Sequence, residues 1–255
     1  MAVTGIGSQW NNSDYLYVGY WGNGTLNVEA RGMVSSTNGY IGRHAGSTGV
    51  AIITGSGSQW NNSGTLGVGI AGTGTLNITD GGVVSNTGGS IGDGGVVTVA
   101  GSGSQWNNSE NLRVWSGTLN VEAGGVVANT NGYIGYSSGS TAVATVTGAN
   151  SQWNNSRQLW VGFYGTGTLN VTDGGVVSNA YSSIGDNSGS TGEVTVTGAN
   201  SQWNNSGVLY VGKAGTGALN VTDGGVVSNI NGFLGDEIDS TGVVTVTGSD
   251  SQWNN

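Results

Sequence analysis

Recurring aspartates are the first residues in this sequence that could do chemistry, because regularly spaced carboxylates can bind calcium. One set lies in Thr-Asp-Gly-Gly and comprises Asp80, Asp173 and Asp223. A second set follows Ile-Gly or Leu-Gly and comprises Asp93, Asp186 and Asp236. Ala30 and Ala123 replace the first set in sister repeats, and an aspartate before glycine usually forms an Asx turn. We therefore expect these residues to shape turns, and we expect no metal site and no cofactor.

General acid–base catalysis needs two carboxylates, or a carboxylate and a cation, together in one groove. The carboxylates are dispersed along the chain, among them Glu29, Glu122, Glu193, Asp173 and Asp186. The cations fall at unrelated positions of the repeat, at Arg31, Arg43, Arg113, Arg157 and Lys213. The one histidine, His44, lies in a variable loop. The sequence therefore predicts no catalytic residues and no enzyme, although some polysaccharide-cleaving enzymes share the fold argued below.

Paired threonines could form a flat binding face. The Thr-x-Thr pattern recurs at Thr145, Thr147, Thr195, Thr197, Thr245 and Thr247. Stacked threonines on a flat strand face resemble the surface of ice-binding solenoids. Ile52 and Ala100 interrupt the pattern in earlier repeats, and β-branched residues also suit an ordinary strand face. Ice binding is therefore an alternative hypothesis.

Aromatic residues gather in another part of the sequence pattern, which recurs as the repeat described below. They lie near the third predicted strand of that repeat and the corner that follows it. The set comprises Tyr15, Tyr17, Tyr20, Trp21, Trp160, Phe163, Tyr164 and Tyr210. Aromatic corners can stack on sugar rings or contact a protein, and scattered surface aromatics are also common. Glycan or host-surface binding is a second alternative hypothesis.

The composition excludes several classes of protein. The chain has 52 Gly, no Pro, no Cys, 7% charged residues and a net charge of −9. The absence of cysteine excludes disulfides and Cys-based metal sites. An acidic chain with five cations is a poor nucleic-acid binder, and no apolar run reaches the length of a membrane span. We find no helical stripe, so short alternating strands between glycine-rich turns remain.

These residues belong to an array. The word Ser-Gln-Trp-Asn-Asn begins at Ser8, Ser58, Ser104, Ser151, Ser201 and Ser251. From Ser58 onward, a second segment, Gly-Gly-Val-Val, lies between successive words. The structural period is therefore about 25 residues, with alternating Trp coils and Val-Val coils. The sequence predicts one domain over residues 1–255, formed by five tandem repeats of about 50 residues and a partial sixth.

A 25-residue unit with three short strands predicts an all-β, right-handed parallel β-helix of about ten coils. The first strand should point Leu or Val inward and Asn or Thr outward. The outward positions form a predicted structural ladder that includes Asn77, Asn120, Asn170 and Asn220. Such stacked side chains can hydrogen-bond along the array.

The second strand should alternate in side-chain size. We expect Val176 to lie over Ser201, and Ser178 over Trp203, so that large residues face small ones. In this register the tryptophan ladder points inward and comprises Trp10, Trp60, Trp106, Trp153, Trp203 and Trp253. The other register turns the tryptophans outward as an exposed aromatic platform.

The whole chain resembles a bacterial repeat. The pattern Gly-Thr-Leu-Asn-Val-Thr-Asp-Gly-Gly-Val-Val-Ser-Asn, then Ile-Gly and Val-Thr-Val-Thr-Gly-Ala-Asn-Ser-Gln-Trp-Asn-Asn-Ser, is similar to repeats of autotransporter (type V secretion) passengers and PEP-CTERM-associated surface proteins. This resemblance implies an extracellular or surface-anchored β-helical stalk, often in adhesins, without catalytic residues.

The strands at both ends of the array offer unpaired edges, which favour end-to-end association. The candidate contact residues are Val3, Val244, Val246 and Trp253. We read the chain as a mature or excised segment. The sequence thus predicts a non-enzymatic structural protein of the bacterial surface, as a stalk or fibre subunit, with a glycan- or ice-binding face as the alternative.

Overall fold

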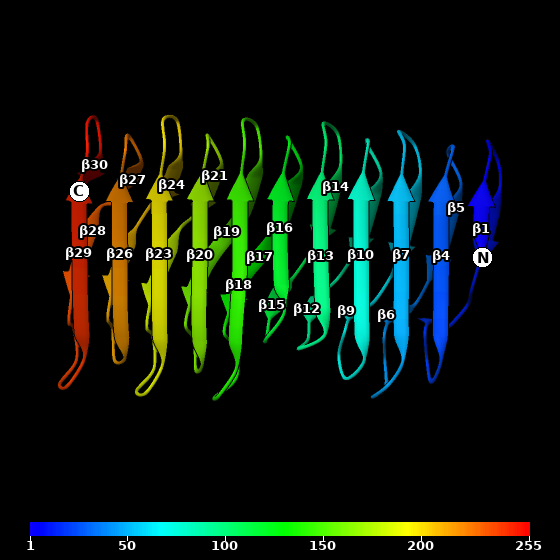
Figure 1. The fold of residues 1–255 in the computed structure, drawn as a ribbon, viewed down its shortest axis with the longest axis horizontal. Helices are drawn as coiled ribbons and strands as arrows, with labels where there is room; N and C mark the ends of the chain where they lie inside the picture. Colours follow the sequence, from blue (N-terminus) through cyan, green and yellow to red (C-terminus); the bar gives the residue numbers. More distant parts are fainter. The chain divides into compact units, whose positions relative to one another are not determined.

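The computed structural model describes residues 1–255, and the chain folds as an all-β parallel solenoid with about 25 residues per turn, about ten turns and no helix. The predicted fold class is confirmed. The residues form two compact units: unit 1 is residues 1–112 and 117–129, and unit 2 is residues 113–116 and 130–255. Each turn contributes three strands, which Figure 1 shows coil by coil.

Unit 1 contains three rows of strands. The first row is β1 (Ala2–Thr4), β4 (Asn23–Glu29), β7 (Thr48–Thr54), β10 (Thr73–Thr79), β13 (Gly95–Ala100) and β16 (Thr118–Glu122). The second row is β2 (Gln9–Asn11), β5 (Met33–Ser36), β8 (Gln59–Asn62), β11 (Val83–Asn86) and β14 (Gln105–Asn108). The third row is β3 (Tyr15–Val18), β6 (Asn38–Ile41), β9 (Leu66–Val68) and β12 (Gly89–Ile91). Two further strands, β15 (Asn111–Val114) and β17 (Val126–Ile134), carry residues of both units.

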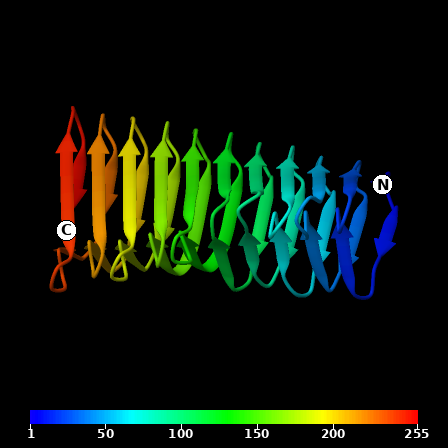
Figure 2. The same ribbon diagram turned by 60° about the horizontal axis from the view of Figure 1, so that its bottom comes forward.

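Unit 2 repeats this plan. Its first row is β18 (Thr141–Thr147), β20 (Thr166–Thr172), β23 (Thr191–Thr197), β26 (Thr216–Thr222) and β29 (Thr241–Thr247). Its second row is β21 (Val176–Asn179), β24 (Gln202–Asn205), β27 (Val226–Ser228) and β30 (Gln252–Asn254), and its third is β22 (Tyr181–Ile184), β25 (Val208–Val211) and β28 (Asn231–Leu234). One long strand, β19 (Gln152–Val161), serves both of these rows. Figure 2 shows the shorter strands that complete each turn.

The first-row strands pair in parallel with the predicted register. Leu169 lies opposite Ala144 and Val194, and Leu219 lies opposite Val194 and Val244. These side chains point into the interior, while the asparagines and threonines between them face outward. Alternation along the strand follows because successive strand side chains point to opposite faces.

The second row departs from prediction by one residue. Val177, not Ser178, lies opposite Trp203, and Val176 lies opposite Gln202 rather than Ser201. The cause is the preceding turn, which runs from 148 to 151 in a Trp coil but only from 173 to 175 in a Val-Val coil. The extra residue shifts the following strand, so Trp60, Trp106 and Trp203 each lie between two valines rather than two serines.

In unit 1, Trp106 shows how the interior is filled. Its side chain is fully buried and lies between Val84 and Val127 in the strands on either side. Its indole N–H donates to Asn86 Oδ1 at 2.8 Å, and Asn86 Nδ2 donates to Asn108 Oδ1 at 2.6 Å. The indole therefore gains a buried acceptor as well as a large apolar contact.

The serine, the glutamine and the first asparagine of the Ser-Gln-Trp-Asn-Asn word make hydrogen bonds of their own. Ser104 Oγ donates to Ala100 O at 2.7 Å and accepts from Gly81 N at 3.0 Å, which ties the turn to its neighbouring coil. Gln105 and Asn107 point outward, and Asn107 Nδ2 donates to Gln105 Oε1 at 3.2 Å. Each residue of the word thus has a structural task, which accounts for its exact recurrence.

A glycine makes room for four of the tryptophans of the column. A Cβ on Gly89 would lie 2.8 Å from Trp106 Cζ2. The same closeness to the next tryptophan recurs at Gly39, Gly132 and Gly232. Ser182 takes this place in one coil and is fully buried.

Candidate functional site

Aromatic side chains line the outward face of the third-row strands and the corner that follows. In unit 1, Tyr15, Tyr17 and Tyr40 stack on one another, with ring centroids 5.5 to 6.1 Å apart. Arg43 lies over the Tyr40 ring at 4.9 Å. The adjoining corner holds Trp21, whose ring stacks on the His44 imidazole at 3.8 Å.

Unit 2 has a similar cluster. Tyr133 stacks on Trp160, with ring centroids 4.5 Å apart, and meets Phe163 edge to face at 5.1 Å. Tyr136 stacks on Phe163 at 5.7 Å, and Arg113 lies 5.3 and 5.8 Å from the Tyr136 and Tyr133 rings. These contacts join aromatic faces and a cation, an arrangement that is favourable beyond simple burial.

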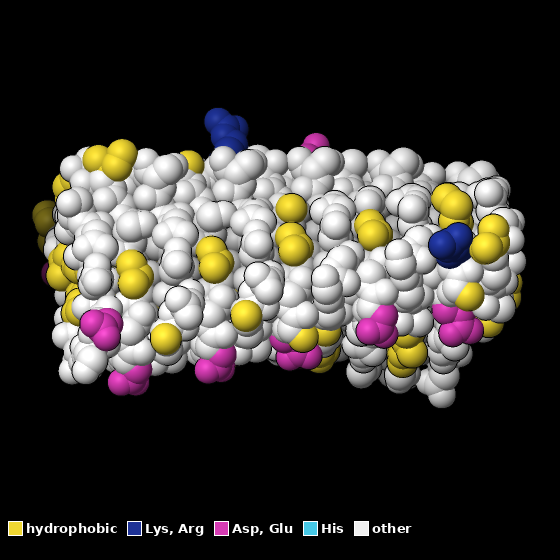
Figure 3. Space-filling view, turned by 90° about the horizontal axis from the view of Figure 1, so that it is seen from above, with side chains coloured by type: hydrophobic (Ala, Val, Ile, Leu, Met, Phe, Trp, Pro, Cys, Tyr) yellow, Lys and Arg dark blue, Asp and Glu magenta, His cyan; other side chains and the backbone are white.

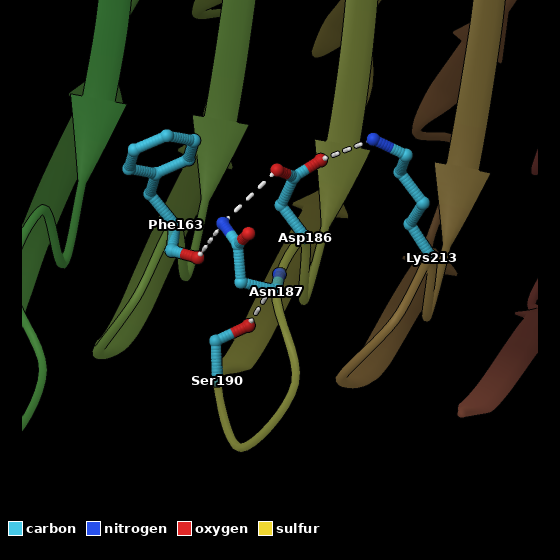
Figure 4. Close-up of polar contacts among 5 residues, drawn as sticks. All are labelled: Phe163, Asp186, Asn187, Ser190 and Lys213. Atoms are coloured by element: carbon cyan, nitrogen blue, oxygen red, sulfur yellow. Dashed lines mark hydrogen bonds and ion pairs between the residues drawn. The ribbon is translucent and has the colours of Figure 1, made fainter. Parts of the chain in front are cut away.

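The second aromatic group of unit 2 surrounds the one ion pair of the chain. Lys213 Nζ lies 3.4 Å from Asp186 Oδ1, and Asp186 is only 7% exposed. Asn187 Nδ2 donates to Asp186 Oδ2 at 3.2 Å and to Phe163 O at 2.7 Å. Figure 4 shows the carboxylate held between this amide and the ammonium group. Lys213 also lies 6.0 Å from the centroid of the Tyr210 ring.

Ser183 lies in the same group. Its strand neighbours on the two sides are Trp160 and Tyr210, and Tyr181 precedes it on the outward face of β22. Its side chain is 0% exposed, yet its hydroxyl has no hydrogen-bond partner. We call this group the Ser183 site, and it comprises Trp160, Tyr181, Ser183, Asp186, Tyr210 and Lys213.

Burial and charge set the protonation of this site. Burial raises the pKa of Tyr181, and the nearby Lys213 ammonium only partly opposes that rise. Burial lowers the pKa of Lys213, but Asp186, Tyr181 and Glu237 together outweigh this effect, so the pKa of Lys213 is raised overall. At neutral pH the site therefore presents a phenol from Tyr181 and an ammonium group from Lys213.

The prediction that the cations fall at unrelated positions of the repeat is wrong for two of the five. Arg43 and Lys213 both follow a third-row strand and its glycine, and each lies over a tyrosine ring. A sequence signal for the ion pair was present. Asp186 and Lys213 are separated by 27 residues, which is also the separation of the paired Ile184 and Val211.

The threonine face has its hydroxyls engaged within the chain. Thr172 Oγ1 donates to Thr147 Oγ1 at 2.8 Å, and Thr147 Oγ1 donates to Asp173 Oδ2 at 3.2 Å. The same chain joins Thr222 and Thr197 to Asp223. Thr145 and Thr195 are half-buried, and Thr245 and Thr247 are exposed. The aspartates of these turns thus accept hydrogen bonds from threonine hydroxyls of the first-row strand one coil earlier. Within each unit, acidic side chains recur along this edge (Figure 3).

The remaining predicted residues are placed as follows. The ladder asparagines Asn77, Asn120, Asn170 and Asn220 face outward and are half-buried. Four tryptophans, Trp60, Trp106, Trp153 and Trp203, are fully buried, and Trp10 and Trp253 are half-buried. Of the residues expected at end-to-end contacts, Val3 is buried, Val244 and Trp253 are half-buried and Val246 is 45% exposed. That association stays a prediction.

The structure brings no three His, Cys, Asp or Glu side chains together in a group that could hold a metal ion. It also has no helix of the length and apolarity that crossing a membrane requires.

No family model matches the sequence, and no curated protein matches it. Among solved structures, the chain is similar to one described as the crystal structure of the TibC-catalyzed hyper-glycosylated TibA55-350 fragment, with 20% identity and a TM-score of 0.30. The match covers 96% of this chain and 100% of that one. TibA is an autotransporter adhesin passenger with a β-helix. At this identity and TM-score the likeness assigns neither a family nor a function to this chain.

Proposed function

We propose that this chain is a non-enzymatic structural protein of the bacterial extracellular surface, which acts as a stiff β-helical stalk. The observation that supports the proposal most directly is the repetition of the interior. In unit 2, Trp203 lies between Val177 and Val227, and its indole N–H donates to Asn179 Oδ1 at 2.9 Å. Each coil is thus held by the coils on both sides through strand pairing, a size-matched core and buried side-chain bonds.

Such an interior suits a spacer, because each added pair of coils reproduces the contacts of the pair before it. Strand spacing of about 4.8 Å would set the increment in length. The bacterial-surface assignment draws on the resemblance of the repeat to surface-protein passengers.

The stiffness can be measured within unit 2. The chain has no cysteine, so spin labels can be placed on Thr145→Cys and Thr245→Cys, four strand steps apart. We expect a narrow distance distribution centred near 19 Å plus the label linkers, from four steps of about 4.8 Å. Duplication of residues 151–200 adds one Trp coil and one Val-Val coil, and should lengthen the distance by about 10 Å without lowering the melting temperature. A broad distribution, or a duplication that leaves the distance unchanged, would count against the stalk.

An ice-binding face is the weaker alternative. The Thr147 and Thr197 hydroxyls each donate to an aspartate and accept from the next threonine. Hydroxyls bonded in this way are less free to order water at the surface.

A further inference from the structure

We propose that the Ser183 site of unit 2 binds a neutral sugar residue of a glycan chain. This inference goes beyond the stalk and does not depend on it. It combines three observations: an unpartnered buried hydroxyl, flanking aromatic rings, and a carboxylate–ammonium pair beside them.

The Ser183 hydroxyl is the observation that indicates a ligand. Ser183 lies on the outward face of its strand, between Trp160 and Tyr210, rather than in the solenoid interior. It is fully covered by its surroundings, and its hydroxyl has neither a donor nor an acceptor within reach. Buried polar groups in folded proteins are almost always hydrogen-bonded, so one without a partner requires an explanation. A ligand hydroxyl would provide the missing partner.

Tyr181 is the ring beside Ser183 that can move to admit a ligand. Tyr181 and Tyr210 have centroids 5.6 Å apart and are tilted by 45°, rather than stacked. Both rings are half-buried. Trp160 is held by its stack with Tyr133, and Tyr210 stacks on Phe233 with ring centroids 4.9 Å apart. The site therefore has two rings held by stacking and one, Tyr181, that is freer to change rotamer.

The polar groups match the hydroxyls of a sugar. Asp186 accepts from Lys213 and Asn187, and a carboxylate has about four acceptor positions, so acceptor capacity remains. Lys213 has three N–H donors, one of which is directed at Asp186. A sugar offers hydroxyls, which both donate and accept, and apolar C–H faces that pack on aromatic rings.

Charge favours a neutral glycan over an anionic one. The Asp186–Lys213 pair has no net charge, and the ammonium is already bonded to the carboxylate. The chain carries a net charge of −9, which repels a polyanion. A neutral chain meets no such penalty.

Affinity electrophoresis tests the proposal with the full chain. Native gels contain hydroxyethyl cellulose, galactomannan or dextran as neutral polysaccharides, or alginate as an anionic one. We expect at least one neutral polysaccharide to retard the wild-type chain. Tyr210→Ala and Asp186→Asn should each weaken the binding about tenfold, because a lost ring stack or charged hydrogen bond has that effect.

Ser183→Ala is the most informative variant. Removal of a hydroxyl that has no partner should leave the melting temperature unchanged or raise it, so a purely structural serine would show no loss of binding. We expect a several-fold loss of binding at an unaltered melting temperature. Ile6→Ala removes an 80% exposed apolar side chain of unit 1 and is the control, which should be retarded like the wild type. The proposal is overturned if no neutral polysaccharide retards the chain, if alginate alone does, or if Ser183→Ala binds as tightly as the wild type.

Discussion

The buried tryptophan column can be tested at Trp203. Its side chain is fully buried between Val177 and Val227, and its indole N–H is bonded to Asn179 Oδ1. Trp203→Ala removes the largest side chain of its coil and leaves a cavity, a change that costs about 3–5 kcal/mol in protein cores. It also leaves the buried Asn179 oxygen without its donor, which adds about 1–3 kcal/mol.

We therefore expect Trp203→Ala to lower the free energy of unfolding by about 4–8 kcal/mol, a large part of the stability of an ordinary domain. Urea unfolding followed by circular dichroism measures the loss. Trp203→Phe keeps an aromatic ring but removes the N–H, and should cost less. Because each coil contacts only its neighbours, hydrogen exchange should accelerate first in β21, β24 and β27.

Trp21→Ala is the matched control, because that side chain is 67% exposed. It should change the free energy of unfolding by no more than about 0.5 kcal/mol. The reasoning about the interior would be refuted if Trp203→Ala cost less than about 1 kcal/mol, or no more than the control.

Two further predictions concern packing and pH. Gly89→Ala should lower the free energy of unfolding by about 1–3 kcal/mol, because the new methyl would meet the Trp106 ring. Gly22→Ala is the control and should be nearly neutral, because a Cβ there meets nothing within 4 Å. Urea unfolding measures both, and equal effects would contradict the packing argument. The pKa of Lys213 is raised in the folded chain, so its stabilising contribution is complete below the ordinary value of 10.5 and is lost as the pH rises through the folded pKa. Melting temperatures measured from about pH 9 to about pH 12 should therefore fall less steeply for Lys213→Met than for the wild type, and parallel curves would contradict the assignment.

The sequence was sufficient for the fold class and for the first-row register, because both follow from periodicity. A repeat of about 25 residues with alternating apolar positions has few other solutions. The second-row register failed because a turn in the Trp coils contains one more residue than its counterpart, and periodicity alone does not say where the extra residue is absorbed. Asn150 and Asn200, both with positive φ, mark the longer turn, and asparagine is among the few residues that tolerate that conformation.

The Ser183 site was only partly predictable. Periodicity placed Trp160 and Tyr210 near one corner of the repeat, and the structure brings both to the site. The pairing of Asp186 with Lys213 could have been found from their spacing of one coil. The unpartnered hydroxyl of Ser183 could not, because it depends on how neighbouring rings cover the strand.

The alternation of tryptophan and valine along the second row has a consequence for how the gene can change. Loss or gain of a single coil during recombination would bring two indoles, or two valines, face to face, and the core would be overfilled or left hollow. Only changes by pairs of coils preserve the fit. The number of coils can therefore change only in steps of two. Individual loops can shorten, but the packing of the interior requires Trp coils and Val-Val coils to alternate.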